Sequence, residues 1–326
     1  MSAKPFDIEF SVVSGSREEL LFECIASVYR VMAESPYVWT MTVTCNTPGD
    51  GLSDRLRARY QDIRTIDNVA RRGFAANHNT VLASSLARYV WLLNDDLIML
   101  PDSVGKITAY MDAPENNRVA VVSPRLLNPD GSLQPSTYSF PTMPQIFLAF
   151  SGLREHSLTD RILRMAAPIV RSRVGSSRYW AHDKTVAVDT LRGACVAVRM
   201  TAAREVGLMI EVALVGGEET EWHRRLHEHG WQVVFFADAS VIHYGSQTVG
   251  ESLGYLYPEY LKSSLYYFRL NRPTLSFAVF NRLLLAIYSA RMASARLRRD
   301  ADALNVARRY VEVIREAMKL PREPAA

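Results

Sequence analysis

Two short acidic segments carry the residues that are best suited to chemistry. In LLNDDLIMLP, Asn94, Asp95 and Asp96 follow a run of apolar and aromatic residues that is typical of a buried strand. Open α/β sheets bind ligands outside the carboxyl ends of their strands, so we expect these side chains to lie in a binding crevice. Adjacent carboxylates repel each other, and a divalent cation, Mg²⁺ or Mn²⁺, that holds a diphosphate would offset this repulsion. A helix cap is the alternative role for the pair.

The second acidic segment, GGEETEW, holds three carboxylates within four residues, Glu218, Glu219 and Glu221, ahead of an expected helix at 222–230. The two glycines before them allow a sharp turn, so that a carboxylate could point into a cleft and remove the proton of an attacking hydroxyl. The alternative is structural, because acidic residues at the start of a helix complement its dipole.

A third candidate is His243, which ends the apolar run of VIHYGSQT. A lone histidine at a strand end is more often a surface or hydrogen-bonded residue, and it becomes a candidate metal ligand only if it faces Asp96. The sequence has none of the patterns GxGxxG, GxxxxGK[ST] and HExxH. Without a glycine-rich phosphate cradle, a metal must take over the task of holding phosphate.

Strands and helices alternate over most of the chain and must position these residues. We expect strands near 8–15, 38–46, 63–68, 88–96, 119–124, 185–190 (leading into 191–199) and 231–245, with helices at 17–34, 52–60, 74–87, 103–111, from 201, and at 222–230. This alternation predicts an α/β fold with a mostly parallel, doubly wound sheet flanked by helices. Residues 145–183 are expected to form a mobile or acceptor-side insertion.

Bulk composition excludes several classes of protein. The 326 residues are 48% hydrophobic and 22% charged, which is typical of a globular chain. The three cysteines lack CxxC spacing, which indicates neither a disulfide framework nor a zinc cluster. The N-terminus does not resemble a secretory signal, so we expect a cytoplasmic protein. The excess positive charge is confined to the stretch 282–319, and we therefore expect no nucleic-acid partner.

The region beyond Gly254 is aromatic and amphipathic, and we expect it to form a helical extension. Arg282 and Arg291 interrupt its apolar runs before they reach the roughly 18 residues that a membrane span requires. Aromatic residues, Leu283–Leu285 and the arginines beyond them predict a helix that lies on anionic lipid. The aromatic residues are Tyr266, Tyr267, Phe268, Phe277 and Phe280. Packing on the catalytic domain or within a homodimer is the alternative.

Taken together, the segments resemble the family-two inverting glycosyltransferases with the GT-A fold, especially the rhamnosyltransferase-like branch. The similarity covers roughly residues 6–270 and is most specific over 216–248. The matching stretches are FSVVSG, RRGFAANHN, VWLLNDDLIMLPDSV, SPRLLNPDGSLQPS, RGACVAVR, GGEETEWHRRLHEHGWQVVFFADASVIHYGSQT and SLYYFRLN. The resemblance implies a catalytic domain at 1–254, with a nucleotide-sugar half near 1–125 and an acceptor half near 126–254, followed by the extension at 255–326.

The resemblance also implies roles for individual residues. Asp96 and His243 match the metal ligands, and Glu219, next to Glu218, matches the catalytic base. Donor-binding residues are implied at Ser14, Asn46, Arg72, Gly73, Phe74, Asn77, Asn94 and Asp95, and acceptor-side residues at Gly193, Glu221 and Trp222. This sequence departs from the family pattern at two places. Asn94 replaces the first acid of the Asp-x-Asp element, and Cys45-Asn46 replaces the aspartate that contacts the pyrimidine ring.

The function that the resemblance implies is sugar transfer from a nucleotide diphosphate donor to a glycan or a polyprenyl-linked acceptor. The favoured donor is dTDP-rhamnose, which would supply L-rhamnose for cell-surface polysaccharide at the inner face of the cell membrane. Two alternatives stay open: a UDP-hexose-dependent transferase of the same fold, and a catalytically inert module that only binds glycan.

Overall fold

The computed structural model describes residues 6–15, 17–151, 182–211, 217–245 and 253–319. The chain divides into two compact units. The first consists of residues 1–139, 177–211 and 219–251, and the second of residues 140–176, 212–218 and 252–326. Most of the predicted insertion at 145–183 lies outside the described residues.

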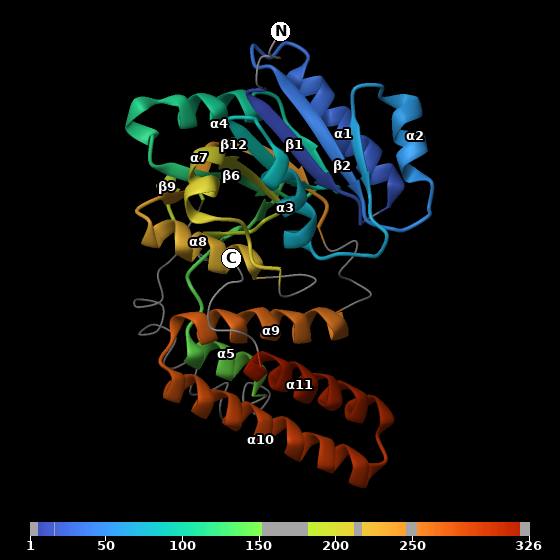
Figure 1. Ribbon diagram of the computed structural model, residues 1–326, viewed down its shortest axis with the longest axis vertical. Coiled ribbons are helices and arrows are strands. Elements are labelled where there is room, and N and C mark those ends of the chain that lie inside the picture. The colour runs from blue at the N-terminus through green and yellow to red at the C-terminus, as the bar shows by residue number, and fades with distance from the viewer. Residues whose placement is uncertain (1–5, 16, 152–181, 212–216, 246–252, 320–326) are drawn as a thin grey trace. The chain divides into compact units, whose positions relative to one another are not determined.

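One large sheet forms the centre of the first unit (Figure 1). Its main strands run in the order β3-β2-β1-β4-β11-β6-β12-β5, with β7 paired to β6 and β9 paired to β12. Their bounds are β1 Ile8–Val13, β2 Trp39–Cys45, β3 Arg64–Asp67, β4 Tyr89–Asn94, β5 Leu97–Met99, β6 Val119–Leu127, β7 Leu133–Gln134, β9 Val186–Ala187, β11 Cys195–Arg199 and β12 Gln232–His243. A separate short pair joins β8 (Thr137–Tyr138) to β10 (Thr190–Leu191).

Strand direction explains why distant residues meet at one edge. β1 is parallel to β2 and to β4, and β12 is parallel to β6. β11 lies antiparallel between β4 and β6, which makes these two neighbours of β11 parallel to each other. The long strands β1, β2, β4, β6 and β12 therefore end at the same edge of the sheet. The predicted α/β class with a mostly parallel sheet is confirmed.

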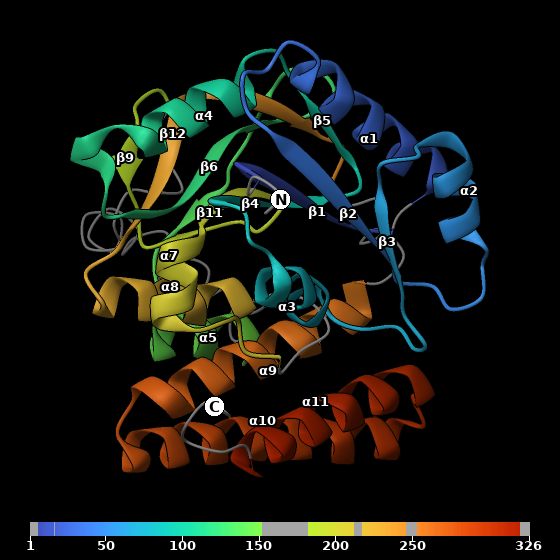
Figure 2. The ribbon, with the colours of Figure 1, turned by 45° about the horizontal axis from the view of Figure 1, so that its top comes forward.

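Helices cover both faces of this sheet (Figure 2). One apolar cluster packs α1 (Glu18–Met32), α2 (Leu52–Arg59) and α4 (Ser103–Asp112) on one face. A second cluster packs α3 (Phe74–Ser84), α7 (Met200–Val206) and α8 (Glu218–Glu228) on the other. β4 shows why its sequence lacks alternation, because Tyr89 through Leu93 are all buried between the two layers.

The start of α8 differs from the sequence prediction. The helix begins at Glu218 rather than at Trp222, so the three carboxylates of GGEETEW lie in its first turn instead of ahead of it. Carboxylates are favourable at this position because they complement the positive end of the helix dipole. α8 packs on the sheet and leads into β12 through a short turn.

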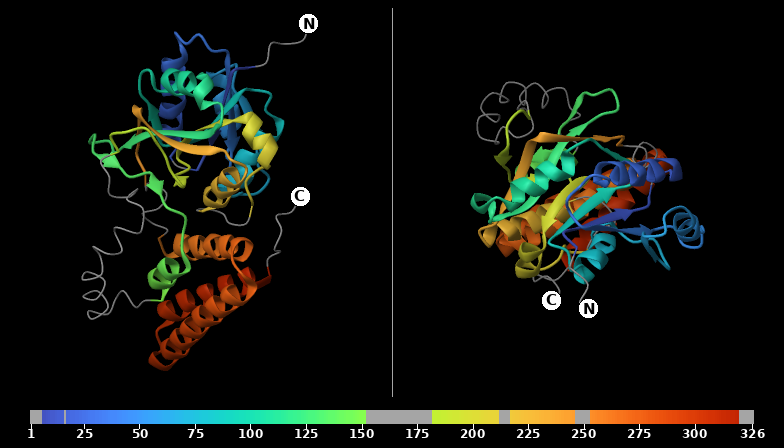
Figure 3. Two further views of the ribbon diagram at one scale, coloured as in Figure 1. Left: turned by 90° about the vertical axis from the view of Figure 1, so that its left-hand side faces the viewer. Right: turned by 90° about the horizontal axis from the view of Figure 1, so that it is seen from above.

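The second unit is a helical assembly of α5 (Met143–Phe150), α9 (Leu253–Asn271), α10 (Thr274–Arg298) and α11 (Ala301–Lys319). Figure 3 shows α10 and α11 side by side, joined by a tight turn. Arg299 in this turn has a φ of 55°, and the Asp300 carboxylate accepts a hydrogen bond from the Ala303 backbone N–H at 2.9 Å. This capping fixes the reversal of the chain.

The aromatic residues of the extension point inward, which corrects the expectation that they would meet lipid. These five side chains and that of Leu284 are at most 6% exposed: Tyr266, Tyr267, Phe268, Phe277 and Phe280. All of them except Tyr266 belong to the apolar core of the second unit. Removing this large apolar area from water stabilises the helical unit more than scattered contact with a lipid surface would. Among the helices that the structure describes, none is both long and apolar enough to cross a bilayer.

Candidate active site

The turn between β4 and β5 brings Asp96 to His243. β5 pairs antiparallel with the end of β12, so that Leu97 lies opposite His243, and the Tyr244 backbone N–H donates to the Asp96 carbonyl at 3.0 Å. The Asp96 Oδ1 atom lies 3.2 Å from His243 Nε2, and both side chains are buried. The condition under which His243 becomes a candidate ligand is therefore met.

Gln134 on β7 sets the orientation of the His243 ring. The Gln134 Oε1 atom lies 2.5 Å from His243 Nδ1, and because an amide oxygen can only accept, Nδ1 carries the hydrogen. In the neutral ring Nε2 is then left with a lone pair, which faces Asp96 and also lies 3.4 Å from the Asn94 amide nitrogen. A histidine that donates its other N–H to an oxygen has the arrangement common among metal ligands.

The surroundings of Asp96 fit a cation. Its Oδ1 atom is buried and accepts no hydrogen bond within the part of the chain that the structure describes. A carboxylate oxygen and a ring lone pair that face each other at 3.2 Å repel unless a proton or a metal ion lies between them. No cluster of three or more His, Cys, Asp or Glu side chains suited to a metal occurs among the described residues. A cation held by this pair would complete its coordination with other oxygens, such as phosphate, as Mg²⁺ usually does.

Asp95 has a different task from Asp96. Its Oδ2 atom accepts a hydrogen bond from the Gly15 backbone N–H at 2.6 Å. Next to this glycine, the Ser14 hydroxyl oxygen accepts from the Asn46 backbone N–H at 2.9 Å. These bonds join the chain just past the ends of β1, β2 and β4. Asp95, Ser14 and Asn46 therefore tie these strand ends together.

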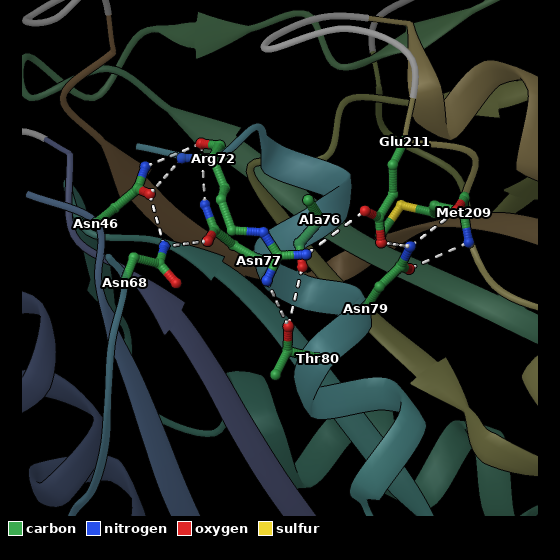
Figure 4. Close-up of polar contacts among 9 residues, drawn as sticks. All are labelled: Asn46, Asn68, Arg72, Ala76, Asn77, Asn79, Thr80, Met209 and Glu211. Carbon is green, nitrogen blue, oxygen red and sulfur yellow. Dashed lines mark hydrogen bonds and ion pairs between the residues drawn. The ribbon is translucent and has the colours of Figure 1, made fainter. Parts of the chain in front are cut away.

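Three buried asparagines hold the turn that precedes α3 (Figure 4). The Asn46 amide pairs with the Arg72 backbone in both directions, accepting from N–H at 2.9 Å and donating to C=O at 3.1 Å. Asn68 donates to the side-chain oxygens of Asn46 and Asn77 at 2.8 and 2.7 Å, and Asn77 donates to the Arg72 carbonyl at 3.2 Å. The Asn46 side-chain oxygen and one of its N–H groups are therefore hydrogen-bonded within the fold. Among the described residues its second N–H has no partner, so it could bind a ligand.

The Arg72 side chain lies between α3 and the segment that leads toward α8. Its guanidinium donates to the Thr80 hydroxyl at 3.2 Å and lies 3.5 Å from a Glu211 carboxylate oxygen, with both charged groups partly exposed. Buried Asn79 anchors the same segment: it exchanges two hydrogen bonds with the Met209 backbone, at 2.8 and 3.1 Å, and donates to Glu211 at 3.0 Å (Figure 4).

Gly193 packs against Phe74, the first residue of α3. A Cβ atom at residue 193 would lie 2.9 Å from the end of the Phe74 ring, which only glycine tolerates at this distance. The ring also makes an edge-on contact with His78, centroid to centroid 4.5 Å. Burial lowers the pKa of His78 to about 3, and its Nδ1 is hydrogen-bonded to the Ser11 hydroxyl at 2.8 Å. A neutral histidine therefore supports Phe74 from within the core.

The first turn of α8 contains both buried and accessible acids. Glu219 is half-buried, whereas Glu218 and Glu221 are buried. Glu221 accepts two hydrogen bonds from Arg225, at 2.8 and 3.0 Å, although burial is the larger influence and raises its pKa. Trp222 lies in the core and donates to the Gly207 carbonyl at 2.7 Å. Glu219 is therefore the most accessible acid of this turn, and the contacts of Glu221 and Trp222 hold the helix in place.

The sequence-predicted residues thus form groups around the same edge of the sheet. Asp96, Asn94 and His243 come together, Asp95 joins the loop of Ser14, and Asn46, Arg72 and Asn77 form a second group. Several supporting residues were missed by the sequence: Gln134, Asn68, Asn79, Glu211 and Arg225. Only Arg225 had a local signal, because it follows Glu221 by one helical turn.

Comparison with known proteins gives a consistent picture. Residues 12–166 match the family model described as glycosyl transferase family 2. The chain is 23% identical over 217 residues to an N-acetylglucosaminyl-diphospho-decaprenol L-rhamnosyltransferase of Mycobacterium tuberculosis, in two strains, CDC 1551 / Oshkosh and ATCC 25618 / H37Rv. The match covers 63% of this chain and 66% of each relative, so about a third of each relative has no counterpart in the match.

A solved structure described as GalNAc-T7 with UDP, GalNAc and Mn²⁺ superposes on this chain with a TM-score of 0.53 at 12% identity. The superposition covers 82% of this chain and 51% of that protein. At this level of identity the likeness concerns the fold, and it supports a GT-A-like arrangement of the mixed sheet.

Proposed function

Residues 12–166 match the family model of glycosyl transferase family 2, and from this match we propose that the protein transfers a sugar from a nucleotide diphosphate donor to an acceptor hydroxyl with inversion. The observation that carries the proposal is the buried Asp96–His243 pair at the carboxyl edge of the sheet. This pair lies where an open α/β sheet binds its ligand and has the chemistry to hold a cation.

Asp96 and His243 are the residues that would hold Mg²⁺ or Mn²⁺. The cation, when bound, would offset the negative charge that grows on the leaving diphosphate. Gln134 keeps the His243 lone pair directed at this place, and Asn94 donates toward the same nitrogen. Because Asn94 is neutral, Asp96 supplies the negative charge of this group.

The donor is proposed to lie along the ends of β1, β2 and β4. Asn46 has one amide N–H that no described residue uses, and this N–H offers a hydrogen bond to a base or ribose. Arg72, Gly73 and Phe74 precede and begin α3, and the positive end of that helix favours a diphosphate. The buried thiol of Cys45, whose pKa burial raises to about 12, stays protonated and is a poor acceptor for a base.

Glu219 is proposed to be the general base. As the acceptor oxygen forms a bond to the anomeric carbon, the carboxylate takes the hydroxyl proton and the bond from that carbon to the diphosphate oxygen breaks on the opposite face. Such a proton transfer typically contributes about 10²–10⁴ in rate. Glu218 would support Glu219 from the same turn, and Gly193 lies next to Phe74 on the acceptor side.

The sugar is proposed to be L-rhamnose from dTDP-rhamnose, with a glycan or a polyprenyl-linked acceptor in cell-surface polysaccharide synthesis at the cytoplasmic face of the membrane. The distant rhamnosyltransferase relatives support this choice of sugar and of acceptor. A thermal-shift panel of dTDP-rhamnose, UDP-hexoses and GDP-mannose, each with and without Mn²⁺ or Mg²⁺, tests the proposal.

We expect stabilisation by dTDP-rhamnose that increases with the cation and is lost in Asp96→Asn. Stabilisation by UDP-hexoses alone would replace rhamnose with hexose as the sugar. If no nucleotide sugar stabilises the protein and none is hydrolysed, the protein is a glycan-binding module and the proposal is wrong.

A further inference from the structure

The outward face of α10 carries an apolar stripe that the helical core leaves uncovered. Leu275, Val279, Leu283 and Leu297 are 74, 47, 51 and 87% exposed, although each is large and apolar. With exposed Ala286, Ala290 and Ala293 they follow one side of the helix, because their spacing is close to multiples of 3.6 residues. From Leu275 to Leu297 the stripe spans 23 residues, which is about 33 Å of helix.

The same helix has an opposite face that is already occupied. Phe277, Phe280 and Leu284 point into the core of the second unit, where Tyr288 stacks on Tyr310 of α11 with a centroid separation of 4.4 Å. α10 is therefore apolar on two sides, of which the core uses one. A helix that only had to pack within its own unit would carry polar residues on the other side.

The charged residues of α10 indicate which kind of surface the stripe binds. The segment 274–298 contains Arg282, Arg291, Arg296 and Arg298 and no aspartate or glutamate. Arg282 and Arg296 are exposed and flank the stripe on one side, and Arg298 is exposed on the other. Arg291 is instead directed to the core unit, where it donates to the Ser151 carbonyl at 2.9 Å.

We propose that this face of α10, the Leu275–Leu297 stripe with its flanking arginines, docks on an anionic lipid surface. The helix would lie in the plane of the interface, with its leucines among the acyl chains and its arginines at the phosphate groups. A second copy of the chain is the less favourable occupant, because a two-fold contact would bring two faces with only positive charge together. The surface is independent of the sugar-transfer chemistry, and vesicle binding needs no nucleotide sugar.

The test is cosedimentation of the full-length protein with vesicles of phosphatidylcholine, alone or with phosphatidylglycerol. We expect binding to the anionic vesicles that weakens with salt. Neutralising Arg282 and Arg296 together (R282Q/R296Q) is expected to reduce the partition coefficient about 30-fold, at about fivefold for each arginine. L283Q/L297Q is expected to abolish binding to the anionic vesicles.

Leu86 in the first unit provides a matched control, since it is also an exposed leucine, at 78%. Leu86→Gln should leave vesicle binding unchanged, and circular dichroism should show native helix content in every variant. Equal binding of L283Q/L297Q and the unchanged protein would overturn the proposal. Absence of binding to the anionic vesicles would also overturn the proposal. If light scattering then showed a dimer that L283Q/L297Q dissociates, the stripe would be an interface between copies of the chain.

Discussion

Gly193→Ala should destabilise the protein through one close contact, that between the added methyl group and the Phe74 ring. The added methyl group would meet the Phe74 ring at 2.9 and 3.2 Å, well inside ordinary van der Waals distance. The ring cannot retreat freely, because His78 contacts it on another side. The backbone at Gly193 needs no positive φ, so the substitution probes only the lack of space.

The expected cost follows from this overlap. Adding a methyl group to a well-packed core costs about 1–3 kcal/mol, which for a unit of this size lowers the melting temperature by about 2–12 °C. Because Phe74 begins α3 next to Arg72 and Gly73, its displacement should also raise the KM for the nucleotide donor more than it lowers kcat.

Gly105 offers the matched control for this measurement. It lies within α4, and a Cβ atom there would have no neighbour within 4 Å. Gly105→Ala should therefore stabilise the protein by about 0.5–1 kcal/mol, since alanine loses less backbone freedom than glycine in a helix. Differential scanning calorimetry of both variants measures these changes in melting temperature. A Gly193→Ala protein as stable as the unchanged protein would refute the packing argument.

Three further predictions concern buried polar groups. Gln134→Leu should weaken Mn²⁺ binding about 10- to 100-fold in a titration calorimeter, because His243 loses the acceptor that orients it; unchanged affinity would exclude His243 as an oriented ligand. Asn79→Ala leaves the Met209 N–H and C=O without their partner, so urea unfolding should show a loss of about 1–3 kcal/mol. Asn117→Ala, at an exposed position, should cost far less. The pKa values of His78 and His223 are lowered by burial to about 3, below the unfolded value of 6.5, so that stability is present above pH 6.5 and is lost as the pH falls. Each histidine should lower the free energy of unfolding by about 1.4 kcal/mol as the pH falls from 7.5 to 5.5. An H78Q/H223Q variant whose urea midpoint depends on pH as steeply as that of the unchanged protein would contradict this.

Positions near strand ends could be predicted from the sequence. The apolar run before Asn94 and the run before His243 mark two strands, and parallel strands end at a common edge. That Asp96 and His243 lie within 3.2 Å of each other depends on β5, a strand of three residues that turns back to pair with β12. A strand this short leaves little trace in a hydrophobic pattern.

Side-chain partners far apart in the chain could not be predicted. Gln134 is separated from His243 by more than one hundred residues and lies in a segment rich in turn residues. Asn68 and Asn79 resemble ordinary polar residues of a turn and a helix, and only the fold shows that their amides are buried. Because neither alternation nor helical period encodes such bonds, they become visible only with the structure.

The orientation of α10 illustrates a different limit. Leu275, Val279 and Leu283 follow one side, and Phe277, Phe280 and Leu284 follow the other, so the sequence supplies two apolar faces and cannot decide between them. The larger aromatic residues were expected outside, at lipid. They lie inside, because their greater area makes them the better core.

The most direct test of the proposed function is the rate of sugar transfer by Glu219→Gln. The substitution keeps the shape of the side chain and removes its ability to take a proton, so transfer should fall by about 10²–10⁴ while donor affinity stays unchanged. Glu228→Gln on the last turn of the same helix, where the acid pairs with Arg224 at 2.8 Å, should transfer at the rate of the unchanged protein. Full activity of Glu219→Gln with the preferred donor would contradict the assignment of Glu219 as the base.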